Sequence, residues 1–156
     1  AAERASEGYA TPVDKGLTYG EALLKPTPIY VPAMLQALSV GGVCYAANIT
    51  GHGWRKIMRS TNELTYVIDR MPPQLPIFDF IQGHGVELRE MYSTYNMGAG
   101  FVMFVDPDKA DEIVGKIDRL NAGYTAFVAG RVEEGPRRVV IDPINMVFEG
   151  DTLQVR

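Results

Sequence analysis

The sequence predicts an α/β (α+β) domain in which a mixed sheet packs with helices. Some stretches, such as residues 110–120, carry apolar side chains at helical spacing, whereas others, such as residues 99–105, are short continuous apolar runs typical of covered strands. The length of 156 residues and the hydrophobic content of 46% suit one compact domain with a substantial core.

The start of the chain has a different character from the rest. Residues 1–20 are polar, are interrupted by glycines and a proline, and show little sustained periodicity. We predict a linker or tail there, with at most a brief helical turn, and a folded domain over residues 21–156. Because the chain does not begin with methionine, we expect it to be a fragment of a longer protein.

Prolines and glycines predict where the first regular elements begin and end. Prolines at 26 and 28 keep residues 25–31 extended, and Pro32 suits the first turn of a helix. That helix would place Met34, Leu35 and Leu38 on one apolar face and would end at Gly41-Gly42.

The stretch at residues 43–59 predicts a strand, a glycine turn and a helix. Arg55 and Lys56 would then fall in the first helical turn, where the macrodipole disfavours cations by roughly 0.3 to 1 kcal/mol. A bound anion would remove that penalty. We therefore predict a phosphate or carboxylate cradle made of glycine amides, the helix N-terminus and the two cations. The alternative is an ordinary turn with solvated basic residues.

The rest of the chain alternates between helical and strand patterns. The proline-rich residues 71–76 predict a rigid connector, and a β-α-β unit over residues 99–132 would have a right-handed crossover if its strands are parallel. The predicted strands are 64–68, 99–105, 124–132, 138–141, 146–148 and 153–155, and the predicted helices are 77–83, 87–95 and 110–121.

Charge and composition exclude several classes of partner. A net charge of −4 and a pI near 5.2 argue against a broad nucleic-acid-binding surface, and no apolar run approaches a membrane span. We therefore expect no nucleic-acid and no membrane partner. The single cysteine, Cys44, has no disulfide partner and no zinc-binding spacing, which predicts a small buried core residue in a reducing, cytoplasmic setting.

No metal site is expected. His52 and His84 each lie between glycines, without further ligands at suitable spacing. Asp106, Asp108 and Asp111 fit helix capping and dipole compensation better than metal binding.

Gly98 and Gly100 begin like a dinucleotide fingerprint, but they precede a strand instead of opening a helix, which is the wrong context. Asn96 and this glycine pair could still bring backbone close to a ligand. A purely structural turn is the alternative.

Four motifs in order resemble one family. LLKPTPIYV at 23–31, ANITGHG at 47–53, PIFDFIQ at 76–82 and EMYSTYNMGAGFVMFV at 90–105 are similar to the C-terminal domain of AIR synthetase, the phosphoribosylformylglycinamidine cyclo-ligase family. The resemblance runs from about residue 17 to 132. It implies a partly ferredoxin-like fold and an ATP-dependent step of purine biosynthesis, which cyclises formylglycinamidine ribonucleotide to aminoimidazole ribonucleotide and releases ADP and phosphate.

The resemblance also implies a missing partner. In that family an N-terminal domain carries most of the residues that bind ATP and Mg²⁺ and forms the homodimer interface, and the phosphorylated ribonucleotide lies between the domains. Nothing in this chain resembles that domain. We therefore expect the fragment alone to bind no cofactor and to be inactive.

The family's motif of histidine, isoleucine, threonine and three glycines falls on residues 48–53, with two departures. Asn48 replaces the histidine, so a titrating role cannot be carried over, and His52 replaces the middle glycine, where a positive φ would strain it. Arg55 and Lys56 come from the dipole argument and are not family residues. The predicted substrate-binding residues are Asn48, Thr50, Gly51, His52, Gly53, Arg55, Lys56, Asn96, Gly98 and Gly100; no catalytic residue is assigned.

Two other classes of function stay open at this point. The departures at 48 and 52 leave room for a related ATP-using enzyme of the selenophosphate synthetase or thiamine-phosphate kinase type. A non-catalytic binding domain is the other alternative.

Overall fold

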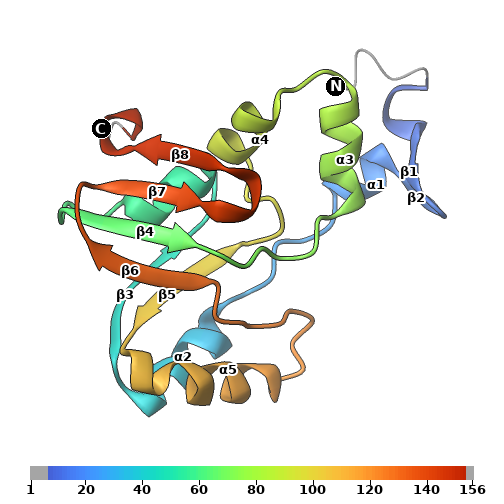
Figure 1. Cartoon of the computed structure of the whole chain (residues 1–156). Helices are drawn as coiled ribbons and strands as arrows, with labels where there is room; N and C mark the ends of the chain where they lie inside the picture. The colour runs from blue at the N-terminus through green and yellow to red at the C-terminus, as the bar shows by residue number, and fades with distance from the viewer. Residues whose placement is uncertain (1–6, 154–156) are drawn as a thin grey trace.

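The computed structural model describes residues 7–153 and has the predicted mixed α/β class (Figure 1). The helices are α1 (Tyr19–Leu23), α2 (Val31–Val40), α3 (Pro76–Gly83), α4 (Leu88–Thr94) and α5 (Ala110–Asp118). The strands are β1 (Pro12–Asp14), β2 (Leu17–Thr18), β3 (Val43–Asn48), β4 (Leu64–Ile68), β5 (Phe101–Val105), β6 (Gly130–Glu134), β7 (Arg138–Ile141) and β8 (Met146–Glu149). Short 3-10 helices are η2 (Gly8–Ala10), η3 (Gly53–Met58), η4 (Pro107–Lys109), η5 (Asp142–Ile144) and η6 (Gly150–Thr152).

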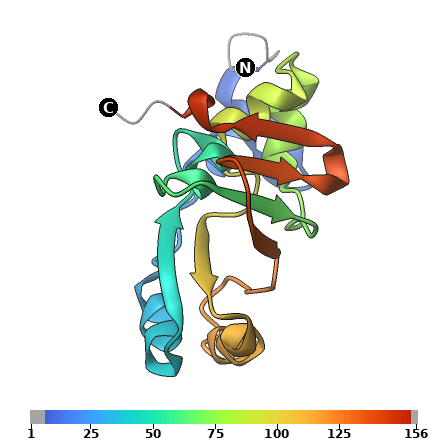
Figure 2. The same cartoon turned by 60° about the vertical axis from the view of Figure 1, so that its left-hand side comes forward.

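Two sheets organise the main body. The larger has the strand order β6-β4-β7-β8, and it is mixed because β4 and β7 are parallel whereas the other pairs are antiparallel. The smaller is the antiparallel ladder of β3 and β5, which runs from Val43 opposite Val105 to Asn48 opposite Phe101. Figure 2 shows β3 and β5 side by side, leading from the larger sheet toward α2 and α5.

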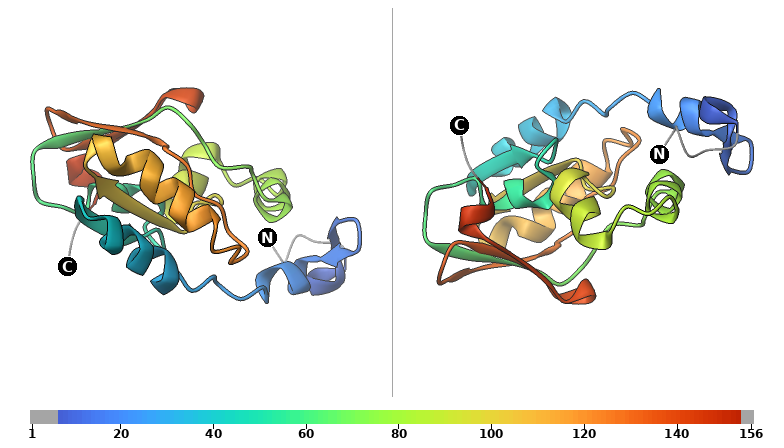
Figure 3. Two further views of the ribbon diagram at one scale, coloured as in Figure 1. Left: turned by 90° about the horizontal axis from the view of Figure 1, so that it is seen from below. Right: turned by 90° about the horizontal axis from the view of Figure 1, so that it is seen from above.

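Two hydrophobic cores correspond to these layers. The larger lies between the four-stranded sheet, η3, α3 and α4, and its fully buried side chains include Trp54, Met58, Met91 and Phe148. The smaller joins α2 and α5 to the β3–β5 ladder; the two helices lie side by side in Figure 3. This layer consists of two helices packed on a two-stranded antiparallel ladder.

Helix α2 has the predicted limits but buries a different face. Pro32 lies in its first turn, and Gly41, with φ of 88°, ends it. Leu35 and Leu38, predicted to face the core, are 60% and 54% exposed. Ala33 and Ala37 are buried instead, because small side chains let α2 approach α5 closely.

The segment predicted as a linker contains more structure than expected. Strands β1 and β2 form a hairpin, and Thr18 and Glu21 form a capping box at the start of α1. The ring of Tyr19, which is buried, lies 5.0 Å from that of Phe80 in α3. Residues 7–20 therefore pack on α3, as Figure 1 shows in blue. The domain boundary at residues 20 and 21 stays a prediction.

The predicted β-α-β unit over residues 99–132 is not formed. Strand β5 pairs with β3, whereas β6 begins only at Gly130 and pairs antiparallel with β4 in the other sheet. A side chain at Gly130 would collide with the carbonyl oxygen of Val67, so glycine allows this close pairing. Of the strand predicted at 153–155, Leu153 follows η6, and residues 154–156 lie outside the described chain.

Cys44 is exposed, which corrects the prediction of a buried core residue. The two-stranded ladder leaves this part of β3 open to solvent. The Cys44 sulfur lies 3.7 Å from a carboxylate oxygen of Asp106.

Candidate functional site

The β3–β5 ladder brings the two glycine motifs together. The N–H of Ile49 donates to the Gly100 carbonyl at 3.0 Å, and the indole N–H of Trp54 donates to the Asn96 carbonyl at 2.8 Å. Residues 48–53, the first glycine turn, therefore lie against residues 96–100, the second glycine turn. Eight of the predicted substrate-binding residues lie in these two turns.

One backbone hydrogen bond spans the first glycine turn, and most of its residues are exposed to solvent. The Gly53 N–H donates to the Thr50 carbonyl at 2.7 Å. Asn48, Thr50, Gly51 and His52 are exposed. Among the described residues, the N–H groups of positions 50–52 have no hydrogen-bond partner. They are thus available to an anion, as predicted for a cradle built from backbone amides.

The glycines of this turn differ in what the fold requires of them. Gly53 is buried with φ of 53°, and a Cβ there would collide with the Tyr92 carbonyl oxygen and lie 2.7 Å from the Ser93 carbonyl carbon. Gly51 has no positive φ, and nothing lies within 4 Å of a Cβ built on it. Packing therefore explains the glycine at 53, but not the one at 51.

His52 carries no backbone strain. Its φ is −114°, so the position that replaces the middle glycine of the family motif does not need a left-handed conformation. The left-handed residue is Gly53, one position later.

The second glycine turn is held by its own asparagine. Asn96 Oδ1 accepts the Gly98 N–H at 3.0 Å, and the Asn96 carbonyl accepts the Ala99 N–H at 2.9 Å. Met97 and Gly98 both have positive φ, 48° and 93°. Met97 is 2% exposed, so its side chain anchors the turn in the larger core.

The dipole argument for Arg55 and Lys56 is wrong. Element η3 is a 3-10 helix of six residues, and both cations fall in its last turn, where the dipole favours positive charge. The two side chains also diverge. Lys56 Nζ donates to Thr50 Oγ1 at 2.5 Å and so stays at the first glycine turn.

Arg55 points away from the first glycine turn. Its guanidinium donates to the Ser93 carbonyl through Nε at 3.2 Å and Nη2 at 2.8 Å, and to the Thr152 carbonyl through Nη1 at 2.6 Å. Arg55 therefore ties η3 to α4 and η6.

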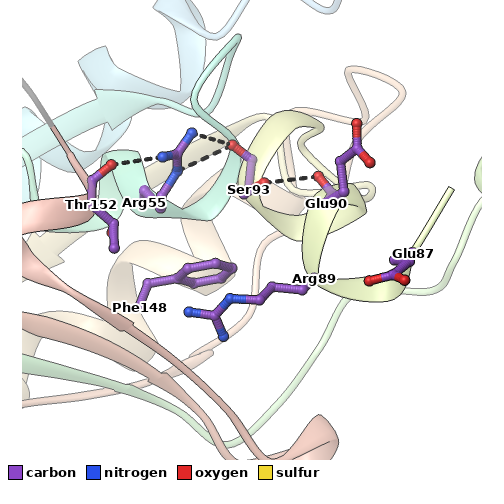
Figure 4. Close-up of a pocket in the computed structure, with 7 residues that line it drawn as sticks. All are labelled: Arg55, Glu87, Arg89, Glu90, Ser93, Phe148 and Thr152. Carbon is purple, nitrogen blue, oxygen red and sulfur yellow. Dashed lines mark hydrogen bonds between the residues drawn. The ribbon is translucent and has the colours of Figure 1, made fainter.

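An open pocket of about 360 Å³ lies beside this arginine (Figure 4). Arg89 lies over the Phe148 ring, 4.8 Å from its centre, and donates to the Val147 carbonyl at 3.0 Å. The sequence did not predict this pocket, because no local pattern relates α4 to the distant strand β8. The lining residues are Arg55, Glu87, Arg89, Glu90, Ser93, Phe148 and Thr152.

Within residues 7–153, no group of three or more His, Cys, Asp and Glu side chains is arranged to hold a metal ion. Asp106 is the N-cap of η4, but its side chain makes no capping hydrogen bond. The His84 ring packs at a tilt of 43° against the Phe80 ring, and its Nδ1 lies 2.7 Å from the Phe80 carbonyl oxygen. In the same range, no helix is both long and apolar enough to cross a membrane.

Two curated relatives carry the same enzyme name. The chain is 42% identical over 120 residues to phosphoribosylformylglycinamidine cyclo-ligase of Methanococcus maripaludis strain C7, which covers 76% of this chain and 34% of the relative. It is 39% identical over 129 residues to the enzyme of that name from Clostridium kluyveri, covering 81% of this chain and 38% of the relative. The chain thus spans about a third of the length of these relatives.

Solved structures share the fold. The Escherichia coli hydrogenase maturation protein HypE gives a TM-score of 0.59 at 14% identity, covering 81% of this chain and 40% of HypE. A chain of a HypE–HypF complex gives a TM-score of 0.54 at 17% identity, covering 78% of this chain and 42% of the matched chain. Residues 4–143 match the family described as AIR synthase related protein, C-terminal domain. The chain therefore belongs to the family of AIR synthase related C-terminal domains.

Proposed function

We propose that this chain is the substrate-side domain of an ATP-dependent cyclo-ligase that converts formylglycinamidine ribonucleotide to aminoimidazole ribonucleotide in purine biosynthesis. The cyclo-ligase relatives at 42% and 39% identity support this function. They do not favour the alternatives, a selenophosphate synthetase or thiamine-phosphate kinase type of enzyme or a non-catalytic binding domain. The cytoplasm, where purine synthesis would take place, stays our predicted location.

The observation that carries the proposal is the set of donors at the first glycine turn. The N–H groups of residues 50–52 are unpartnered within the described chain, and the Lys56 ammonium lies at the Thr50 hydroxyl, 2.5 Å away. Backbone amides, a hydroxyl and a cation together are suited to a phosphate group. We propose that they bind the phosphate of the ribonucleotide.

Gly51 and Asn48 refine that proposal. Because packing does not require glycine at 51, we assign its missing side chain to close approach by the ligand. Asn48 pairs with Phe101 at the end of the ladder and is exposed. Its neutral amide can donate and accept hydrogen bonds to substrate, but it does not transfer a proton near neutral pH. Arg55 is left out of the proposed site, since its guanidinium is bonded to backbone carbonyls.

The chain's share of catalysis would be binding and orientation. Holding the ribonucleotide in a reactive geometry lowers the barrier by fixing the reacting groups together. ATP, when bound, supplies the phosphoryl group that makes the substrate's amide oxygen a leaving group. We propose that ATP and Mg²⁺ are held mainly by an N-terminal domain of the same enzyme, which is a homodimer when complete.

A chimera tests the function. The C-terminal third of the Methanococcus maripaludis cyclo-ligase would be replaced by this chain, and aminoimidazole ribonucleotide formation would be followed with ATP and substrate. We expect activity that falls when Lys56→Ala is introduced, and none from the isolated 156-residue chain. A folded, ATP-binding chimera that forms no product would contradict the proposal, and product formation by the isolated chain would contradict the need for a second domain.

A further inference from the structure

Tyr30 anchors an otherwise exposed segment to the second glycine turn. Residues 24–29, between α1 and α2, are all exposed, whereas Tyr30 is half-buried. Its ring stacks on Phe101 with centroids 5.4 Å apart and an interplanar angle of 19°, and it meets Tyr124 at the same centroid distance. Phe101 directly follows Gly100, so the ring reaches the end of the second glycine turn.

The Tyr30 ring occupies the space that a side chain at Gly100 would need. Gly100 has no positive φ, so its backbone would accept an alanine. A Cβ built there, however, would collide with the Tyr30 hydroxyl and lie 2.8 Å from Cζ and 3.2 Å from Cε2. The carbonyl of the same Gly100 accepts the Ile49 N–H at 3.0 Å. Tyr30 therefore packs on the residue whose backbone joins the two glycine turns.

We infer that Tyr30 is a positioning residue, whose ring holds the second glycine turn against the first and thereby orients the donors of the first turn toward the ribonucleotide. The inference rests on the proposed function for its ligand.

The environment of Tyr30 shows that it acts by packing and not by charge. Burial, with Tyr124 as the second cause, raises the pKa of Tyr30, so its hydroxyl is neutral at physiological pH. The buried Tyr124 hydroxyl has no hydrogen-bond partner among the described residues. Ring contacts therefore hold this cluster together, and a side chain that keeps the ring should keep the function.

The test combines hydrogen exchange with calorimetry on the 156-residue chain. Tyr30→Leu keeps apolar bulk but loses the ring, Tyr30→Phe keeps the ring, and Tyr45→Leu is the matched control, because Tyr45 stacks on Phe104 of the same ladder at 5.8 Å. In Tyr30→Leu we expect faster exchange of the Ile49 amide and about tenfold weaker binding of formylglycinamidine ribonucleotide. Tyr30→Phe and Tyr45→Leu should stay within about twofold of the wild type in both measurements.

A second variant separates coupling from a general loss of stability. Gly100→Ala should weaken ribonucleotide binding by itself but add little in the Tyr30→Leu background, since both changes disturb the same contact. The amide of Val139, which is fully buried in the larger core, reports whether any variant unfolds globally.

Each outcome decides a different claim. Unchanged Ile49 protection in Tyr30→Leu, or effects of Tyr30→Leu and Gly100→Ala on affinity that simply add, would overturn the positioning role. Faster Ile49 exchange with wild-type affinity would overturn its link to the ligand. If the wild-type chain binds no ribonucleotide, the proposed function fails, and Ile49 exchange still decides whether Tyr30 holds the turns together.

Discussion

Gly53→Ala should destabilise the fold strongly, whereas Gly51→Ala, two residues away in the same turn, should not. Gly53 has φ of 53°, a conformation that costs a non-glycine residue about 1–2 kcal/mol. The added Cβ would also collide with the Tyr92 carbonyl oxygen, and overpacking of this kind costs about 1–3 kcal/mol. Together these terms predict a loss of about 2–5 kcal/mol in the free energy of unfolding.

Gly51→Ala is the matched control, because no atom lies within 4 Å of a Cβ at that position. Its free energy of unfolding should stay within about 0.5 kcal/mol of the wild type. Urea unfolding can be followed by the fluorescence of Trp54, the sole tryptophan, which is 2% exposed and adjacent to Gly53. We expect the midpoint of Gly53→Ala to fall by about 1 M or more. Equal midpoints for the two variants would refute the distinction between a packing glycine and a ligand-facing one.

Three further outcomes follow from the contacts. Arg55→Ala should lower the free energy of unfolding by about 1–3 kcal/mol in urea titrations, because the Ser93 and Thr152 carbonyls lose a charged donor, but it should leave ribonucleotide affinity unchanged. Thr18→Ala should lower the free energy of unfolding by about 1 kcal/mol and speed amide hydrogen exchange in α1, because it removes the capping box. Unaltered exchange in α1 would contradict this prediction. Burial raises the pKa of Tyr66 and Tyr92 in the folded chain, so stability should be complete below the unfolded-state pKa of about 10 and fall as pH rises above it. Tyr92→Phe should reduce that alkaline loss in pH-dependent melting.

Local signals in the sequence predicted the elements well. Helix α2 has Pro32 in its first turn and ends at Gly41 as expected, because proline and glycine act directly on the backbone of their own residues. The helical spacing of apolar residues at 77–81 correctly predicted α3. The two glycine turns were also identified as the candidate site. That they meet was not predicted, since it depends on β3 pairing with β5.

The wrong predictions share a cause: each concerns a feature that is determined by residues distant in the sequence. Leu35 and Leu38 are more apolar than Ala33 and Ala37, yet α5 selects the alanine face because small side chains permit close packing. The strand after α5 begins late, at Gly130, where glycine lets it pair with β4. Arg55 was assigned to an anion site because the sequence did not reveal that η3 is a short 3-10 helix or that the Thr152 carbonyl lies within reach.

The central claim is that the first glycine turn binds the phosphate of the ribonucleotide. Calorimetric titration of the 156-residue chain with formylglycinamidine ribonucleotide, and with the matching nucleoside that lacks the phosphate, tests it most directly. We predict that the ribonucleotide binds more tightly than the nucleoside. Lys56→Ala should weaken ribonucleotide binding by about tenfold, as expected for loss of a charge-assisted hydrogen bond. Arg59→Ala, which removes an exposed cation at the end of η3, should not change the affinity. Equal binding of nucleoside and ribonucleotide, or equal effects of the two substitutions, would contradict the claim.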